Sequence, residues 1–271
     1  ELPGIKEPER VRKLLQGSAN LEFWETYNSN EIVPTLQAVD SKLREVLAVA
    51  GGEEAAPAEA KAESAVSATD SLAAALKGDA ANNEAMMAQL KKEHPLASIL
   101  QLGGYGSVVG IANYKDTAEV NKLLAVKEAQ NLLPRDLRLK WGVKSMDKAG
   151  QLFELFAIKV TERNGKAPLE GDVITDAKND FDQYNNPTVS MSMNTDGSRR
   201  WATLTKNNIG RAIAIVLDGY VYSAPNVQNE ITGGNSQISG SFTPEETLDL
   251  ANVLKSGKMP APARIVQEDI V

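Results

Sequence analysis

Few residues in this sequence could carry out covalent or metal chemistry. His94 is the only histidine, in the polar run KKEHP, and cysteine is absent. A Ser–His–Asp site would have to use His94, whereas thiol nucleophiles, zinc–thiolate sites, iron–sulfur clusters and disulfides are excluded. Sites with three histidines and the HExxH motif are excluded by the same count. We therefore expect His94 to be an exposed loop residue, and we expect no enzyme activity, no cofactor and no metal.

Glycine-rich and acidic segments offer no stronger site. The run 104–110 (GYGSVVG) is loosely similar to a dinucleotide loop, but it precedes a predicted strand, so no helix N-terminus follows to hold a phosphate. Glycines 233–234 and 240 lack the Lys-Ser/Thr of a P-loop. Four aspartates lack the spacing of a calcium loop: Asp172, Asp176, Asp180 and Asp182. We interpret them as a solvated acidic face and expect a binding or mechanical role for the chain.

Length and charge narrow the class of protein. The chain has 271 residues, enough for one large domain or two smaller ones. Its net charge of −7 makes a broad basic surface for nucleic acid unfavourable. The one charge-free stretch of membrane length, 95–114, contains four glycines and is expected to form a helix end, a turn and a strand. We therefore expect a soluble globular domain without a nucleic-acid partner.

A β-hairpin is the element that must organise the C-terminal half. The apolar run 212–217 is followed by Asp218-Gly219 and then by Tyr220, Val221 and Tyr222. An Asp-Gly pair between such runs predicts a type I′ turn, which needs positive φ at both residues. The continuous apolar run predicts a strand that is covered on both faces. The two tyrosines share a face, which suits either half-buried structure or a peptide-contact surface.

The remaining elements follow from periodicity and capping signals. Thr243-Pro244-Glu245-Glu246 predicts a capping box and a helix that ends near Gly257. Asp196 is expected to cap a helix over 198–207, and residues 171–183 are expected to form a short helical or turn region. Other helices are expected at 7–16, 32–47, 70–77, 83–92 and 116–133. Other strands are expected at 19–26, 107–114, 137–143, 152–160, 188–193 and 264–266.

Several long motifs resemble one family. The segments IGRAIAIVLDGYVYSAP, ITGGNSQISGSFTPEE and LKSGKMPAPARIVQE, with the opening LPGIKEPERVRKLLQGSANLEF and the later FAIKVTERNGKAPLEGDVITDA, are similar to the large first extracytoplasmic domain of SecD or of a SecD–SecF fusion. These are accessory subunits of the bacterial Sec protein-export translocase. The resemblance covers roughly residues 1–28 and 150–271, whereas residues 31–149 depart from it as a large insertion.

The resemblance implies an α+β fold with ferredoxin-like base and head subdomains, antiparallel sheets, and a largely helical α+β insertion. The base would comprise 1–30, 150–166 and the closing strand in 258–271, and the head 168–257. The insertion, 31–149, would contain a low-complexity linker at 51–68. Connectors between base and head suggest hinge candidates at Pro168, Gly171, Gly257 and Pro260.

The function implied by the resemblance is mechanical. The domain would bind an emerging unfolded preprotein on the periplasmic side of the bacterial inner membrane and promote forward export. Proton flow through membrane segments outside this sequence would drive it, with SecF and the SecY channel as partners. Apolar surface and strand edges accept many sequences, which suggests four contact candidates: Tyr220, Tyr222, Ile238 and Phe242.

Other interpretations stay open from the sequence. The four candidates could be plain core residues. The chain could be the porter-type periplasmic domain of a proton-coupled efflux relative, which would need an apolar cleft. It could also be an envelope scaffold whose insertion docks a partner through the Ala/Glu-rich linker.

Overall fold

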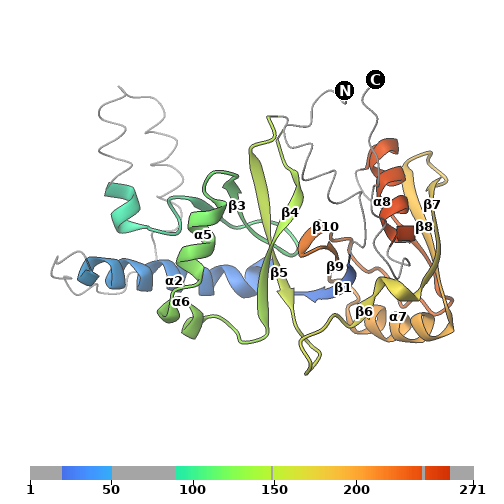
Figure 1. Ribbon diagram of the computed structural model, residues 1–271, viewed down its shortest axis with the longest axis horizontal. Helices are drawn as coiled ribbons and strands as arrows, with labels where there is room; N and C mark the ends of the chain where they lie inside the picture. The colour runs from blue at the N-terminus through green and yellow to red at the C-terminus, as the bar shows by residue number, and fades with distance from the viewer. Residues whose placement is uncertain (1–19, 51–88, 148, 240–241, 257–271) are drawn as a thin grey trace, which may run out of the picture. The chain divides into compact units, whose positions relative to one another are not determined.

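The computed structural model describes residues 20–50, 89–147, 149–239 and 242–256 (Figure 1). They form a mixed α+β fold with antiparallel sheets, as expected. The chain divides into two compact units. The larger comprises Glu1–Ser29, Gly104–Val109 and Asp136–Val271, and the smaller comprises Asn30–Gly103 and Gly110–Arg135. Residues 136–149, expected in the insertion, therefore belong to the larger unit.

Five strands of the larger unit pair into a closed ring. They are β1 (Leu21–Thr26), β4 (Leu137–Ser145), β5 (Leu152–Lys159), β9 (Ile213–Leu217) and β10 (Tyr220–Ser223). β1 pairs with β9, β9 with β10, β10 with β4, β4 with β5, and β5 again with β1. Only the β10–β4 pairing is parallel. We call these five strands the ring, and each of them has a strand partner on both sides.

The hairpin β9–β10 confirms the turn that was predicted from the sequence. Asp218 has φ 46° and Gly219 has φ 89°, the positive values of a type I′ turn. Every residue of β9 is buried, as its continuous apolar run predicts. The register advances by two residues on β10 for one on β9 between Val221 and Ser223, so a β-bulge lies at Tyr222.

A second, open sheet in the same unit has the order β11-β8-β7. Its strands are β7 (Ile174–Phe181), β8 (Pro187–Met193) and β11 (Asn235–Ile238), and η1 (Gly171–Val173) precedes β7. The expectation of a helical or turn region at 171–183 holds for η1, but it was wrong for Ile174–Phe181, which form the strand β7. Its outer face is polar, and a bulge between Ile174 and Asp176 breaks the alternation that would have identified it.

Two helices cover the inner face of the open sheet. They are α7 (Thr195–Asn207) and α8 (Pro244–Ser256), which lie on the same side of β7 and β8 in Figure 1. The side chain of Asn194, not of Asp196, caps α7 by accepting a hydrogen bond from Gly197 N–H (2.8 Å). The predicted capping box of α8 is confirmed: Glu246 N–H donates to Thr243 Oγ1 (3.2 Å), and Thr243 N–H donates to Glu246 Oε2 (2.9 Å).

One hydrophobic core joins the ring to the open sheet. Phe23 of β1 contacts Trp201 of α7 edge to face, with ring centroids 5.3 Å apart. Leu169, in the two-residue strand β6 (Leu169–Glu170) that pairs with β1, lies in the same core. The core also includes residues of β8, β9 and α8: Val189, Met191, Ile213, Ile215, Leu250 and Leu254. The division into base and head stays a prediction, and any such division has to account for this shared core.

The smaller unit contains α2 (Ser29–Ala50), whose buried stripe has the predicted spacing: Ile32, Leu36, Val39 and Leu43. It also contains β2 (Leu100–Leu102), which pairs antiparallel with β3 (Val108–Asn113). Gly110 is required there, because a Cβ would lie 2.7 Å from Leu100 Cδ1. The helix expected over 116–133 is two helices, α5 (Thr117–Leu124) and α6 (Lys127–Leu132), because Val126 is extended (ψ 136°).

None of the helices in the described ranges is both long and apolar enough to span a bilayer. Several predictions concern residues outside those ranges. They are the first helix, the linker 51–68, the helix at 70–77 and most of that at 83–92, the hinge candidates Gly257 and Pro260, and the closing strand in 258–271.

Candidate functional site

Two of the four predicted contact residues meet around a lysine. Lys144, near the end of β4, places its Nζ 4.8 Å from the ring centroid of Tyr222 and 5.4 Å from that of Phe242. The same Nζ forms an ion pair with Glu246 Oε1 (3.0 Å) in the first turn of α8. We call these four residues the Lys144 cluster. The ammonium is held by two aromatic faces and one carboxylate, so the cluster ties β4 and β10 to α8.

Local backbone features position the members of the Lys144 cluster. The bulge on β10 turns Tyr222 toward α8, where its hydroxyl donates to the backbone carbonyl of Glu246 (3.3 Å). The capping box fixes the first turn of α8 and therefore the Glu246 carboxylate. Tyr222 and Phe242 are half-buried and pack against the shared core.

The electrostatics of the Lys144 cluster suit a structural contact. Burial, and then the negative charges of Asp249 and Glu246, raise the pKa of the Tyr222 hydroxyl far above its ordinary value, so the phenol stays a hydrogen-bond donor at neutral pH. Burial acts to raise the pKa of Glu246, but hydrogen bonds from Thr243 N–H and Lys144 outweigh it and the pKa lies below its usual value. Neither group is poised to transfer a proton near neutral pH.

The structure separates the other two candidates from the Lys144 cluster. Tyr220 is 37% exposed, whereas Val221 beside it is buried. Ile238 is only 5% exposed and lies in the core, so a bound chain cannot reach its side chain in this conformation. Of the four, Tyr220 is the most accessible. Lys144 was not singled out from the sequence, and Glu246 was predicted only for the capping box, because no local pattern indicates that β4 lies beside β10.

The connector with hinge candidates Pro168 and Gly171 is held on two sides. Arg200 of α7 donates through Nη2 to the Pro168 carbonyl (2.6 Å). Leu169 is fully buried opposite Phe23, and Gly171 is buried in η1. A hinge motion at this connector would have to break these contacts.

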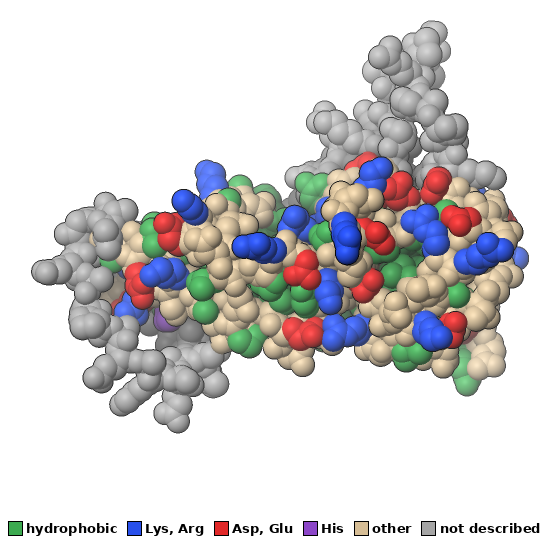
Figure 2. Space-filling view, turned by 90° about the horizontal axis from the view of Figure 1, so that it is seen from below, with side chains coloured by type: hydrophobic (Ala, Val, Ile, Leu, Met, Phe, Trp, Pro, Cys, Tyr) green, Lys and Arg blue, Asp and Glu red, His purple; other side chains and the backbone are tan. Residues whose placement is uncertain are grey.

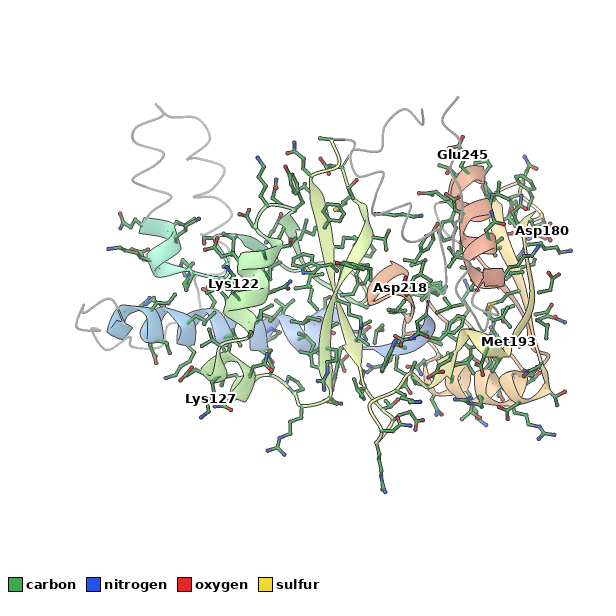
Figure 3. All side chains as sticks on the ribbon, in the orientation of Figure 1. Lys122, Lys127, Asp180, Met193, Asp218 and Glu245 are labelled. Carbon is green, nitrogen blue, oxygen red and sulfur yellow. The ribbon has the colours of Figure 1, made fainter. Side chains whose placement is uncertain are left out.

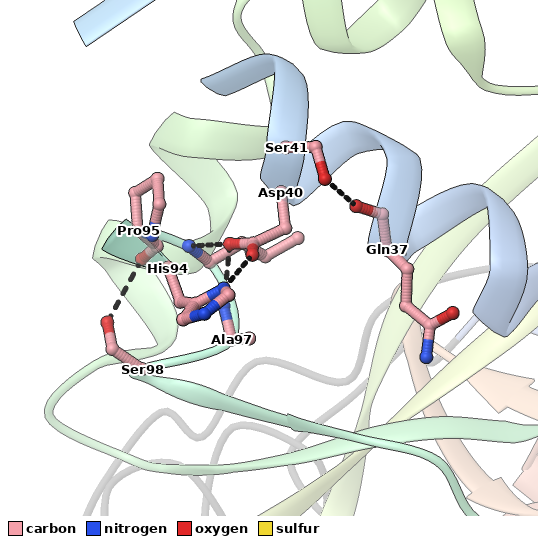
Figure 4. Close-up of polar contacts among 8 residues, drawn as sticks. Gln37, Asp40, Ser41, His94, Pro95, Ala97 and Ser98 are labelled. Atoms are coloured by element: carbon pink, nitrogen blue, oxygen red, sulfur yellow. Dashed lines mark hydrogen bonds and ion pairs between the residues drawn. The ribbon is translucent and has the colours of Figure 1, made fainter. Parts of the chain in front are cut away.

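His94 forms a pair with a carboxylate in the smaller unit (Figure 4). Its Nδ1 lies 2.9 Å from Asp40 Oδ2. Asp40 is 4% exposed, and its Oδ1 accepts hydrogen bonds from the N–H groups of Leu96 (2.8 Å) and Ala97 (3.0 Å). The nearby Ser98 hydroxyl donates to the Pro95 carbonyl (3.3 Å). The pair therefore anchors the segment after His94 to α2.

In the part of the chain that the structure describes, charged groups do not gather into a metal site. Among the residues that the structure describes, no three His, Asp or Glu side chains lie close enough to hold a metal. The four clustered aspartates extend from η1 along β7 to the following turn. Figure 2 shows lysine and arginine side chains interspersed with acidic ones on the face it presents.

The fold and site therefore define an α+β domain. The Lys144 cluster and the His94–Asp40 pair hold its elements together, and the candidate contact residue Tyr220 is exposed at its surface. Residues 156–261 match the family model of the SecDF P1 head subdomain. The chain is 39% identical over 274 residues to a protein translocase subunit SecD of Rhodothermus marinus, covering 100% of this chain and 41% of that protein. A SecD of Magnetococcus marinus is 40% identical over 140 residues, covering 51% of this chain and 26% of that protein.

The chain therefore belongs to the SecD family and spans less than half the length of these relatives. Because the Rhodothermus alignment covers the whole chain, residues 31–149 are shared with that relative. A solved structure described as a membrane component, SecDF, that enhances protein export is 22% identical, covers 93% of this chain and 100% of its own, and gives a TM-score of 0.33.

Proposed function

We propose that this domain binds an unfolded preprotein outside the membrane and promotes its forward export as part of the Sec translocase. The observation that carries the proposal is the alignment of the whole chain with a protein translocase subunit SecD at 39% identity. The efflux and scaffold alternatives have no comparable support. In the complete subunit, proton flow through membrane segments would supply the driving force, with SecF and the SecY channel as partners on the inner membrane.

The surface around β10 is the proposed contact region. Tyr220 offers an exposed aromatic face, and the half-buried rings of Tyr222 and Phe242 lie beside the Lys144 side chain. Aromatic side chains bury a large area against many partner sequences, which suits a chain of varying composition.

Site-specific photocrosslinking tests this contact. A photoreactive amino acid at Tyr220 in the full-length subunit should capture a translocating preprotein in good yield. Tyr114 is the matched control, because it is also a half-exposed tyrosine (46% against 37%) and lies in the smaller unit. A yield at Tyr220 no higher than at Tyr114 would remove the assignment of this surface.

We infer that a hinge at Pro168 and Gly171, acting with Gly257 and Pro260, moves the head during export. The strand β6 lies between Pro168 and Gly171 and pairs with β1. A covalent link between β6 and β1 should therefore stop the hinge motion. Glu22 and Glu170 are cross-strand partners, so Glu22→Cys with Glu170→Cys offers a disulfide in a chain without other cysteines. Export should fall on oxidation and recover on reduction. Unchanged export by the fully oxidised protein would rule out a hinge that opens this pairing.

A further inference from the structure

The outer edge of β7 is a row of backbone groups with no strand partner among the described residues. The sheet order β11-β8-β7 leaves β7 at one end. α8 lies on the inner face of the sheet, not in its plane, where Leu250 and Leu254 pack in the core (Figure 1). Unpaired strand edges are templates for the addition of another extended chain.

The hydrogen-bond pattern shows which groups face that edge. Asp182 N–H donates to the Asn186 carbonyl (3.0 Å), which makes these two residues a bonded pair at the start of the β7–β8 ladder. Bonded and non-bonded pairs alternate in an antiparallel ladder. Phe181 therefore belongs to a non-bonded pair with Pro187, which has no N–H to donate.

Continuing the alternation places Asn179 and Ala177 in non-bonded pairs with residues of β8. Their N–H and C=O groups therefore point away from β8, toward the outer edge. The Phe181 N–H also points outward, but it donates to Asp180 Oδ1 (2.9 Å). The edge thus offers donors at Ala177 and Asn179 and acceptors at all three residues.

Charge along this edge favours a basic partner. β7 and the turn that follows it carry one ammonium group, on Lys178, and three carboxylates: Asp176, Asp180 and Asp182. Lys255 reaches Asp176 from α8 (3.8 Å). Asp180, labelled in Figure 3, lies beside β7 on the side away from α8. Hydrogen bonds, the largest from Phe181 N–H, lower the pKa of Asp180, so its charge persists at neutral pH.

Aromatic side chains mark the end of the same edge. Phe181 is 49% exposed and Tyr184 is 77% exposed. Asp182 Oδ1 accepts hydrogen bonds from the N–H groups of Tyr184 and Asn186 (both 2.8 Å), which hold the backbone of the turn that carries Tyr184. An apolar side chain of an added strand can pack here without reordering the turn.

We propose that the outer edge of β7 binds an extended, lysine- or arginine-containing stretch of an unfolded polypeptide as a fourth strand, with an apolar side chain against Phe181 and Tyr184. The inference rests on the proposed function and names how the partner is held. Main-chain hydrogen bonds recognise any extended sequence, whereas the carboxylates select for basic residues.

Amide hydrogen exchange of the whole 271-residue chain, followed by NMR, tests the proposal. The probe is a peptide that alternates valine with lysine or threonine and matches the eight residues of β7, and its counterpart carries glutamate for lysine. The lysine peptide should protect the amides of Ala177 and Asn179 and should lose affinity as salt rises. The glutamate peptide should bind at least about tenfold more weakly, because its carboxylates repel those of the β7 edge.

Asn179→Pro should weaken binding of the lysine peptide by about tenfold or more, because it removes an outward N–H without removing a β7–β8 bond. Gln237→Pro on β11 is the matched control. Met193 N–H donates to the Gly234 carbonyl (2.8 Å), and the register then places the Gln237 N–H on the other outer edge of the sheet. The control should bind the peptide as the unmodified chain does.

Each other outcome overturns the proposal in a recognisable way. Binding without protection of Ala177 and Asn179 places the peptide elsewhere, and leaves the proposed function standing. Protection without peptide assigns the edge to a second copy if it increases with protein concentration, and to the chain's own segments if it does not. Absence of peptide binding refutes the β7 edge alone if Tyr220 still crosslinks to a preprotein, and counts against the proposed function as well if it does not. If Asn179→Pro fails to fold, the amide protection of the unmodified chain and its relative affinity for the lysine and glutamate peptides still test the proposal.

Discussion

The ring and the open sheet use β-strands in opposite ways within one unit. Every ring strand is paired on both sides, and β9 is buried along its whole length. The open sheet buries one face on α7 and α8 and leaves a polar face and two edge strands, β7 and β11. A closed set of strands has no edge to offer another chain, whereas an open sheet does. We infer that the ring can meet a partner only through side chains such as Tyr220, whereas the open sheet can also accept a partner along a strand edge.

Two phenylalanines provide the strongest test of this contrast. Phe23 in the ring is fully buried against Trp201, whereas Phe181 at the end of β7 is 49% exposed. Phe23→Ala should lower the free energy of unfolding by about 3–5 kcal/mol, through lost burial and the cavity left behind. Phe181→Ala should change it by less than about 0.5 kcal/mol. Urea denaturation of both variants measures the difference, and equal losses would contradict the contrast between the ring and the edge of the open sheet.

A glycine in α7 tests how tightly the open sheet is joined to its helices. A Cβ on Gly197 would lie 2.6 Å from Cβ of Val173 in η1. Alanine favours a helix by roughly 0.5–1 kcal/mol, but the overpacking costs more, so Gly197→Ala should destabilise the protein by about 1–3 kcal/mol. Gly233, where a Cβ would have nothing within 4 Å, is the control. If the unfolding temperature of Gly197→Ala equals or exceeds that of the unmodified chain, η1 shifts to make room for the added Cβ, and the prediction is wrong.

What the sequence could predict was local. The Asp218-Gly219 turn and the capping box of α8 were predicted because their signals lie within a few residues, as was the stripe of α2. The ring closes through Val221 opposite Gly142, residues far apart in the chain whose pairing no local pattern encodes. The same distance hid the contact between Lys144 and Glu246, although Tyr222 and Phe242 beside Lys144 were already candidates from the family resemblance. β7 was missed because its bulge and polar face imitate a turn.

The Lys144–Glu246 pair joins β4 of the ring to α8 beneath the open sheet, and its contribution should depend on pH. The pKa of Glu246 is below the model-peptide value of 4.5, so the folded state binds its proton less readily than the unfolded state does. The stabilisation is therefore complete above the unfolded pKa and is lost as pH falls through the folded pKa. Since both side chains are about one-third exposed, the expected size is about 0.2–1 kcal/mol.

Glu246→Gln should accordingly reduce the free energy of unfolding at about pH 7 and have little further effect at an acidic pH below the folded pKa of Glu246, where the carboxylate of the unmodified chain is protonated. Glu245→Gln, an exposed change in the same helical turn, controls for the general loss of a negative charge near the N-terminus of α8. Urea unfolding at the two pH values separates them. If the two variants lose equal stability at neutral pH, the contact between the ring and α8 depends on the packing of Lys144 against Tyr222 and Phe242 and not on the ion pair. Protonation of Glu246 would then leave this contact between the ring and α8 in place.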